Sequence, residues 1–144
     1  MPHKSLILFI FIVLLQGCHK PPAIEQLLQR VDALEQAVET KQIDTAIAML
    51  TEDFKTDHNE SRKDAKRLLL FYSLRHEQIH ILRTHTKAEQ DPVYPDRANV
   101  SFSAVVTGGH GLIPDQGRSY QVNSRWVYED GDWYLDRLEW KPLL

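Results

Sequence analysis

Two histidines and a glutamate lie close together in the segment His76-Glu77-Gln78-Ile79-His80. On a helix, His76 and His80 would share one face and could bind zinc, with Glu77 as general base. The apolar pattern predicts instead that a helix ends near His76 and that a strand runs through His80. A strand does not bring residues four apart together as a helix does. Zinc hydrolysis is therefore kept only as a remote alternative, and no metal site is predicted.

Several other side chains could act as acids, bases or pocket walls, but none lies in a recognisable catalytic motif. An enzyme of the isomerase type needs an acid and a base whose pKa values are separated inside an apolar pocket. We assign no catalytic residue and expect no cofactor. The residues of suitable type, kept as pocket candidates, are Tyr72, His80, His85, Trp126 and Asp136.

The composition is that of one folded domain. The chain has 144 residues, 42% of them hydrophobic and 26% charged, which is close to the average for globular proteins. Its 17 Lys and Arg against 20 Asp and Glu give a formal net charge of −3, so no domain-wide basic surface is available to bind nucleic acid. The single cysteine cannot form an internal disulfide.

The N-terminus has the three-part layout of a secretory signal. Lys4 precedes an unbroken apolar run over residues 6–15, and Gln16 and Gly17 then lead to the only cysteine, Cys18. A membrane-spanning helix needs about 20 apolar residues, and this run has half that number. The segment therefore predicts export rather than a transmembrane anchor.

The residues Leu15-Gln16-Gly17-Cys18 resemble the bacterial lipobox. The resemblance implies cleavage before Cys18 and lipidation of that cysteine, which would anchor the protein to a membrane. His19 stands where the sorting rules would need Asp for inner-membrane retention, so we expect the outer membrane, facing the periplasm. The predicted division is a signal peptide over 1–17, a lipidated tether over 18–22 and a domain over 23–144. The alternatives are a free cysteine beside an ordinary signal peptide or a buried cysteine in an N-terminal helix.

Three helices are predicted in the first half of the domain. Apolar residues recur at spacings of three and four from Ile24 to Val38, which is typical of an amphipathic helix. Asp44 is expected to cap a short helix over 45–50. Ser61 and Asp64 have the form of a capping box that opens a third helix through Leu74.

Four strands are predicted in the second half, because the apolar spacing changes from helical to alternating after Gln78. A turn over 91–96, a loop over 108–117 and a hairpin turn over 129–132 separate them. The hairpin turn contains Asp130-Gly131, a pair favoured in two-residue turns. The expected strands cover residues 79–85, 98–106, 120–128 and 133–140.

This order of elements, closed by the hairpin over 125–135, resembles the nuclear transport factor 2-like superfamily, with its SnoaL-like and ketosteroid isomerase-like branches. The expected fold is α+β, with N-terminal helices packed on a curved antiparallel sheet of about four strands. The resemblance implies a cone-shaped domain with an apolar pocket, often in a homodimer. The superfamily contains both enzymes and binding domains, so fold alone sets no function.

The last two strands carry apolar residues at both alternating positions. Trp133 and Leu135 fall on one parity of the last strand, whereas Tyr134, Leu138 and Trp140 fall on the other. A sheet with one wet face should alternate more cleanly. We therefore expect the helices to cover one face and a second subunit to cover the other. The alternative is a monomer whose aromatic residues lie flat at the sheet edges.

The predicted function is a non-catalytic binding or assembly module of the envelope, for a hydrophobic small molecule or an envelope protein. The alternative is a small pocket enzyme of the isomerase or dehydratase type. A basic cluster over residues 62–67 is either a solvated helix face or a surface that rests against anionic lipid head groups.

Overall fold

The computed structural model describes residues 24–110, 113–114 and 117–143. The predicted signal peptide, the tether and Cys18 lie outside the described residues. No helix in the described part is long and apolar enough to span a bilayer.

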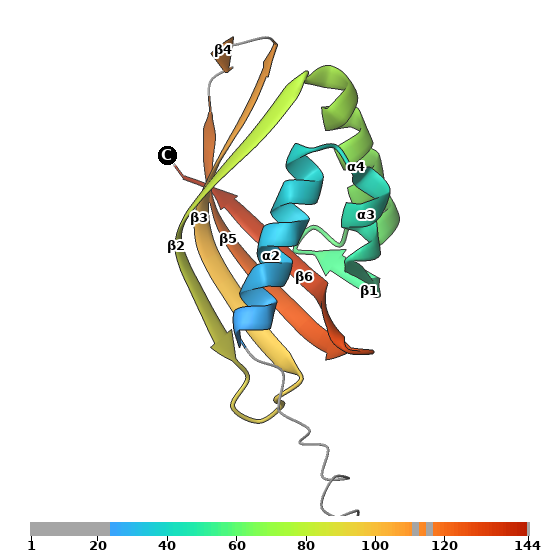
Figure 1. The fold of residues 1–144 in the computed structure, drawn as a ribbon, viewed down its shortest axis with the longest axis vertical. Helices are drawn as coiled ribbons and strands as arrows, with labels where there is room; N and C mark the ends of the chain where they lie inside the picture. The colour runs from blue at the N-terminus through green and yellow to red at the C-terminus, as the bar shows by residue number, and fades with distance from the viewer. Residues whose placement is uncertain (1–23, 111–112, 115–116, 144) are drawn as a thin grey trace, which may run out of the picture.

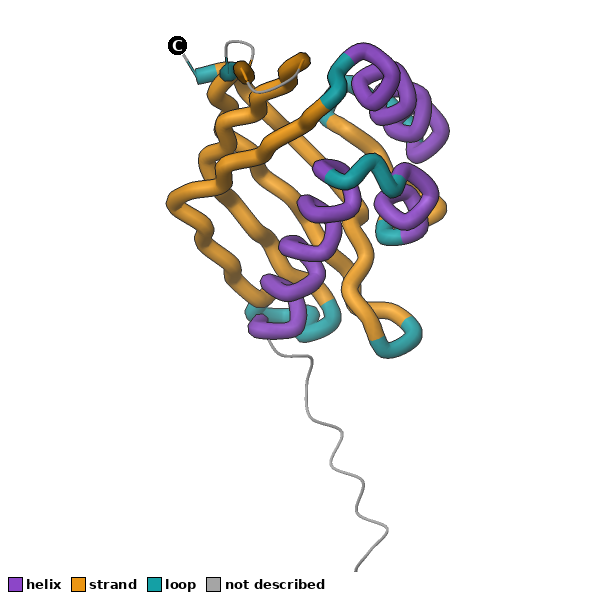
Figure 2. Tube along the Cα trace, turned by 45° about the horizontal axis from the view of Figure 1, so that its top comes forward, coloured by secondary structure: helices purple, strands orange, loops and turns teal. Residues whose placement is uncertain are grey.

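The domain is α+β, as predicted, with its helices gathered on one face of a curved sheet (Figure 1). The tube view in Figure 2 shows α2 lying across the hollow of this sheet. The strand order is β1-β6-β5-β3-β2, and the short β4 pairs with β3. The elements are α2 (Ile24–Glu39), α3 (Ile43–Ala48), β1 (Leu50–Thr56), α4 (Arg62–Arg75), β2 (Gln78–Gln90), β3 (Arg97–His110), β4 (Ile113–Pro114), β5 (Arg118–Glu129) and β6 (Asp132–Pro142).

The helices begin close to their predicted positions. The apolar stripe of α2 buries Leu27 and Val31 against the sheet. The capping box of α4 is present, because the Ser61 side chain accepts from the Asp64 backbone N–H and the Asp64 carboxylate accepts from the Ser61 N–H. The cap predicted for Asp44 is wrong. Helix α3 starts at Ile43, two residues earlier than predicted, so Asp44 lies in its first turn and pairs with Lys66 at 2.7 Å.

Strand β1 was not predicted, and it makes the sheet mixed rather than purely antiparallel. It pairs in parallel with β6, with Leu50 opposite Leu135. Two of its central residues, Glu52 and Asp53, are exposed acids, and acidic residues are poor strand formers. The strand exists because Leu50 and Phe54 are buried in the core.

The β5–β6 hairpin closes as predicted. Asp130 has φ 49° and Gly131 has φ 84°, and positive φ at both central residues defines the turn type that matches the twist of two paired strands. From this turn, Tyr128 pairs with Trp133 and Trp126 with Leu135.

A β-bulge in β6 explains the two-sided apolar pattern. The register shifts between Arg125 and Trp126, so that Trp126 faces Leu135 whereas Ser124 faces Leu138. The residue added by a bulge reverses the alternation of the side chains that follow it. Leu138 and Trp140 therefore lie on the same inner face as Trp133, whereas Tyr134 pairs with Val127 on the outer face. The bulge thus removes two of the apolar residues assigned to the outer face, and the homodimer stays a prediction.

Large side chains fill the space between the helices and the sheet. Trp126 and Trp133 are 2% and 0% exposed. The indole N–H of Trp126 donates to the Ser124 hydroxyl at 3.0 Å, which donates in turn to the Val100 carbonyl at 2.9 Å. The other members of this core are Leu27, Val31, Ile43, Ile47, Leu50, Phe54, Ala98, Val100 and Leu135.

Candidate functional site

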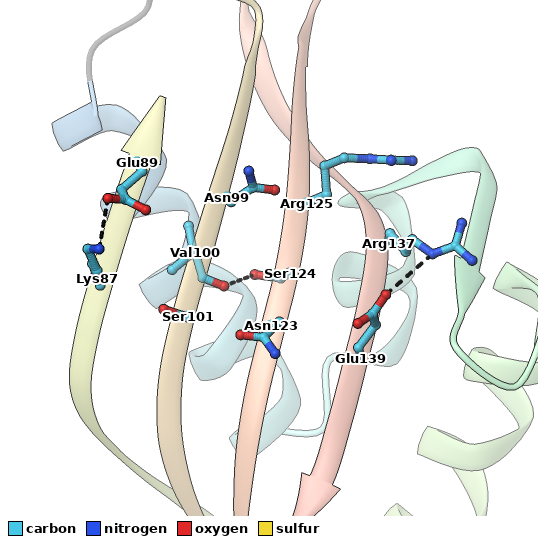
Figure 3. A pocket seen from close by; sticks show the side chains of 10 residues that line it. All are labelled: Lys87, Glu89, Asn99, Val100, Ser101, Asn123, Ser124, Arg125, Arg137 and Glu139. Atoms are coloured by element: carbon cyan, nitrogen blue, oxygen red, sulfur yellow. Dashed lines mark hydrogen bonds and ion pairs between the residues drawn. The ribbon is translucent and has the colours of Figure 1, made fainter. Parts of the chain in front are cut away.

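The face of the sheet turned away from the helices carries a shallow depression of about 320 Å³ (Figure 3). We call this surface the outer polar face. Two rows of polar side chains cross four strands there, in the order β2, β3, β5 and β6. One row is Glu89, Asn99, Arg125 and Arg137, and the other is Lys87, Ser101, Asn123 and Glu139.

Strand alternation places these side chains outside. In β3, the buried residues Ala98 and Val100 point to the core, so Asn99 and Ser101 between and beyond them point outward. A third row, Thr84, Ser103, Gln121 and Lys141, continues the same surface along the strands. The central part of the outer face is therefore polar on all four strands.

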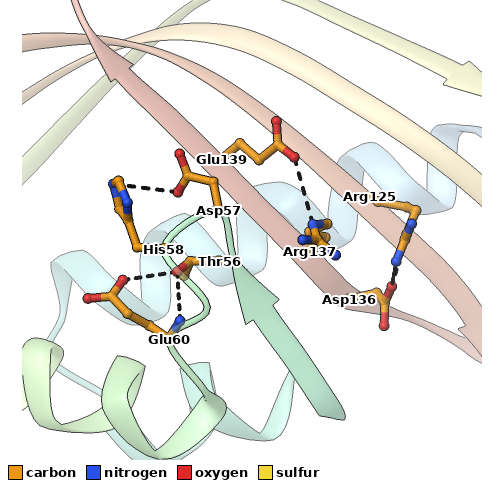
Figure 4. Close-up of polar contacts among 8 residues, drawn as sticks. All are labelled: Thr56, Asp57, His58, Glu60, Arg125, Asp136, Arg137 and Glu139. Atoms are coloured by element: carbon orange, nitrogen blue, oxygen red, sulfur yellow. Dashed lines mark hydrogen bonds and ion pairs between the residues drawn. The ribbon is translucent and has the colours of Figure 1, made fainter.

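Ion pairs balance the charges of the depression. Lys87 Nζ lies 2.8 Å from Glu89 Oε1, and Arg137 Nε lies 3.7 Å from Glu139 Oε1. Arg125 Nε donates to Asp136 at 2.9 Å (Figure 4). Three cations therefore face three carboxylates, and the surface suits a partner that carries both donors and acceptors rather than a highly charged ligand.

Uncommitted amide and hydroxyl groups lie between these ion pairs. Within the described chain, the side chains of Asn99, Ser101 and Asn123 make no hydrogen bond. An amide offers two donor hydrogens and an acceptor oxygen. These groups can bind a partner without breaking an internal bond first.

Asp136 fixes one side of the depression. Its carboxylate accepts from Arg125 on β5 and from the Thr51 hydroxyl on β1 at 3.2 Å. Because Asp136 belongs to the bulge of β6, it reaches both neighbouring strands. The bulge thus orients Arg125 next to Arg137, which is its direct cross-strand neighbour.

A second charged cluster joins α2 to β2 on the inner side. Arg83 pairs with Asp32 and lies 3.1 Å from Glu35, and its side chain is 15% exposed. Glu39 accepts from the Ile81 backbone N–H at 2.7 Å. Burial raises the pKa of Glu35 above its usual value of 4.5, and the charge of Arg83 opposes this rise. The contacts of this cluster hold α2 against the edge strand.

The five pocket candidates do not come together. Trp126 is buried in the core, and Asp136 lies in the β6 bulge. Tyr72 is exposed on α4, where its ring stacks on His76 with centroids 5.4 Å apart. His80 and His85 are exposed on β2, and His85 has φ 53° at a bulge in that strand.

The two histidines of the zinc motif lie on different elements, as the apolar pattern predicted. His76 follows the last helical residue of α4 with φ −117° and ψ 131°, and His80 lies within β2. Within the described residues, no three His, Cys, Asp or Glu side chains gather into a metal site.

The outer polar face was not identified from the sequence. Its residues alternate with core positions in β3 and β5, so the sequence shows which positions of each strand are polar. The cross-strand rows depend on register, and the bulge in β6 displaces Arg137 and Glu139 from the alternation that precedes it. The sequence therefore showed the polar residues of each strand, but not which residues of the neighbouring strands lie beside them.

Comparison of the sequence with family models finds no match, and comparison with curated proteins finds none. Solved structures match at low identity. Aln2 from a Streptomyces species is 11% identical with a TM-score of 0.73, covering 85% of this chain and 94% of that one. A "putative dehydratase from the NTF2-like family" from Streptomyces avermitilis is 15% identical with a TM-score of 0.71, covering 84% and 96%.

Bd1075 from Bdellovibrio bacteriovorus is 16% identical with a TM-score of 0.71 over 83% of this chain. The present chain spans only 40% of that protein. Matches at such low sequence identity indicate a shared fold but not a shared activity. The helix-lined curved sheet and these similarities together show that the chain has the nuclear transport factor 2-like fold.

Proposed function

We propose that this protein is a lipid-anchored, non-catalytic binding module of the bacterial cell envelope, and that it binds an envelope protein through the outer polar face. The observation that carries the proposal is the position of the depression. It lies on the open face of the sheet, whereas Trp126, Trp133 and Phe54 occupy the inner side. Attachment through Cys18 is part of the proposal and rests on the lipobox resemblance.

The chemistry of the outer polar face favours a protein over a hydrophobic small molecule. Protein interfaces combine ion pairs, amide hydrogen bonds and ordered water. The rows supply two ion pairs, Lys87 with Glu89 and Arg137 with Glu139. The amides of Asn99 and Asn123 lie between these pairs. A hydrophobic ligand would have to strip water from these groups without replacing their hydrogen bonds, which is unfavourable.

The same geometry favours binding over catalysis. An acid–base enzyme needs its titrating groups within hydrogen-bond reach of one substrate. The residues that could play this part, Tyr72, His80 and His85, lie exposed on α4 and on β2. Two similar structures carry provisional dehydratase names, and loss of water from a hydroxylated small molecule in a turnover assay would support that alternative.

The proposal can be tested by native mass spectrometry of the full chain, extracted from its own cells in mild detergent. We expect a stoichiometric complex with a protein. Asn123→Arg should remove that protein, because a long cation would fill the depression. Glu129→Arg, which adds the same side chain on the exposed hairpin, should leave the complex intact.

A chain that carries a tightly held organic molecule and no protein would contradict the proposal and favour a small-molecule pocket. A protein that is retained equally by wild type and both variants would show that binding uses another surface.

A further inference from the structure

Helix α4 is the most exposed of the described helices. Helices α2 and α3 each bury three residues, whereas none of the 14 residues of α4 is buried. Its C-terminal half is nevertheless rich in large apolar side chains. We call these residues the α4 apolar patch: Leu68, Leu70, Phe71, Tyr72 and Leu74.

Two residues of the patch point away from the core. Ala65 and Leu69 pack against the core cluster, which fixes the inner side of the helix. At 100° per residue, Phe71 and Leu74 project from the opposite side, and they are 54% and 88% exposed. These residues therefore contribute little to the domain's own packing.

The ends of α4 are held by specific contacts rather than by burial. Ser61 and Asp64 form the capping box at its start. At its end, Lys41 Nζ donates to the Ser73 carbonyl at 3.0 Å and to the His76 carbonyl at 2.6 Å. The helix thus presents the patch on a fixed backbone.

The first half of α4 is basic. The helix contains five cations and one acid, Asp64, in a chain of net charge −3. Three of the cations are paired, because Arg62 contacts Glu52, Lys66 contacts Asp44 and Arg67 contacts Asp64.

The other two cations, Lys63 and Arg75, form no ion pair with a described residue. The guanidinium of Arg75 lies 5.7 Å from the centre of the Phe71 ring, at the edge of the patch. Counting Asp44 and Glu52 with the helix leaves an excess of two positive charges. An apolar patch is therefore bordered by unneutralised cations.

We propose that α4 docks on the surface of an anionic phospholipid bilayer. Helices that combine exposed Leu and Phe with Lys and Arg lie in membrane interfaces, with the apolar side chains among the acyl chains and the cations at the phosphates. The charge excess selects an anionic surface, because each Lys or Arg near such a surface adds to the attraction. The proposal does not depend on the proposed partner of the outer polar face.

Helices α2 and α4 both lie on the side of the sheet away from the outer polar face, and α2 begins at the end of the domain away from α4 (Figure 1). Six residues from Cys18 to Ile24 can reach about 20 Å when extended. With α4 on the bilayer, the outer polar face points away from it and stays open.

The experiment uses residues 19–144, since all residues of the buried core cluster lie between Leu27 and Leu135 and the segment therefore carries its own core. This segment has no cysteine. Leu74→Cys and Val93→Cys each provide one site for an environment-sensitive dye, at positions that are 88% and 71% exposed. Vesicles of phosphatidylcholine with 0 or about 30% phosphatidylglycerol are the probe.

With the anionic vesicles we expect a blue shift of the dye at position 74 and none at position 93. Sedimentation should show binding that weakens in high salt. Phe71→Ser should reduce binding at least tenfold, and Lys63→Gln should reduce it roughly fivefold. Val93→Ser, which removes an even more exposed apolar side chain in the β2–β3 turn, should not change it.

Equal binding to neutral and anionic vesicles, or no loss with Phe71→Ser, would overturn the proposal. A dimer that forms without lipid and is dissolved by Phe71→Ser would instead assign the patch to a second copy of the chain. Circular dichroism of each variant separates loss of binding from loss of the fold.

Discussion

The buried hydrogen-bond chain from Trp126 through Ser124 to Val100 predicts a large cost for removing one hydroxyl. Ser124 is 6% exposed and Trp126 is 2% exposed, so water cannot replace the lost oxygen. In Ser124→Ala, the indole N–H of Trp126 loses the acceptor at 3.0 Å and the Val100 carbonyl loses the donor at 2.9 Å. Leaving a buried polar group without a partner costs about 1–3 kcal/mol. We therefore expect Ser124→Ala to lower the free energy of unfolding by about 2 kcal/mol.

This cost corresponds to a clear change in melting temperature. The entropy of unfolding is roughly 0.25 kcal/mol per degree for a domain of about 120 residues. A loss of 2 kcal/mol therefore lowers Tm by about 8 °C. Urea denaturation followed by tryptophan fluorescence gives the free energy, and calorimetry gives Tm.

Ser103→Ala is the matched control. Ser103 lies on the neighbouring strand but faces outward, where its hydroxyl contacts Gln121 at 3.2 Å. Water can replace that contact, so the expected loss is below about 0.5 kcal/mol. Equal destabilisation by the two substitutions would refute the argument that burial of the Trp126 N–H sets the cost.

Three further outcomes are expected. After a high-salt wash, which also releases protein held through α4, Cys18→Ser should leave the membrane fraction for the soluble envelope fraction, and retention of the washed variant at the membrane would contradict lipid anchoring. Ser61→Ala should destabilise the domain by about 1 kcal/mol through loss of the α4 cap, which urea denaturation would measure against Ser119→Ala. Because burial raises the pKa of Glu35 in the folded state, the folded chain binds this proton more readily than the unfolded chain. Stability should therefore fall as pH rises from 4.5 through the raised pKa, and Glu35→Gln should flatten that part of the curve.

The helices and the hairpin could be predicted because their signals are local. The apolar stripe of α2 and the capping box at Ser61 depend on residues a few positions apart. Asp130-Gly131 likewise carries its own turn preference. The same local reasoning placed the end of α4 near His76 and separated the two histidines of the zinc motif.

The rest of the fold depends on contacts between distant segments. Strand β1 contains exposed acids and is held by pairing with β6 about 85 residues later, as in the bond from Thr51 to Asp136. The bulge at Asp136 reverses the alternation of β6, so Leu138 and Trp140 lie on the inner face and not on the outer face where the strand pattern placed them. No single-strand pattern contains this information, because register is a property of two strands.

The candidate site was hidden for the same reason. Asn99, Ser101 and Asn123 are ordinary polar residues of their strands, and they become a surface only when β3 and β5 are aligned. The α4 apolar patch was hidden differently. Its leucines look like core residues in the sequence, and only their exposure in the folded chain separates them from the core.

Photo-crosslinking in living cells can show whether the outer polar face is the binding surface. A photoreactive residue at Ser101 lies within the depression, and one at Glu129 lies on the exposed hairpin as the control. We expect Ser101 to give a discrete adduct with an envelope protein, Asn123→Arg to remove this adduct, and Glu129 to give none. Absence of an adduct from Ser101, with the protein correctly folded and present in the envelope, would contradict the claim.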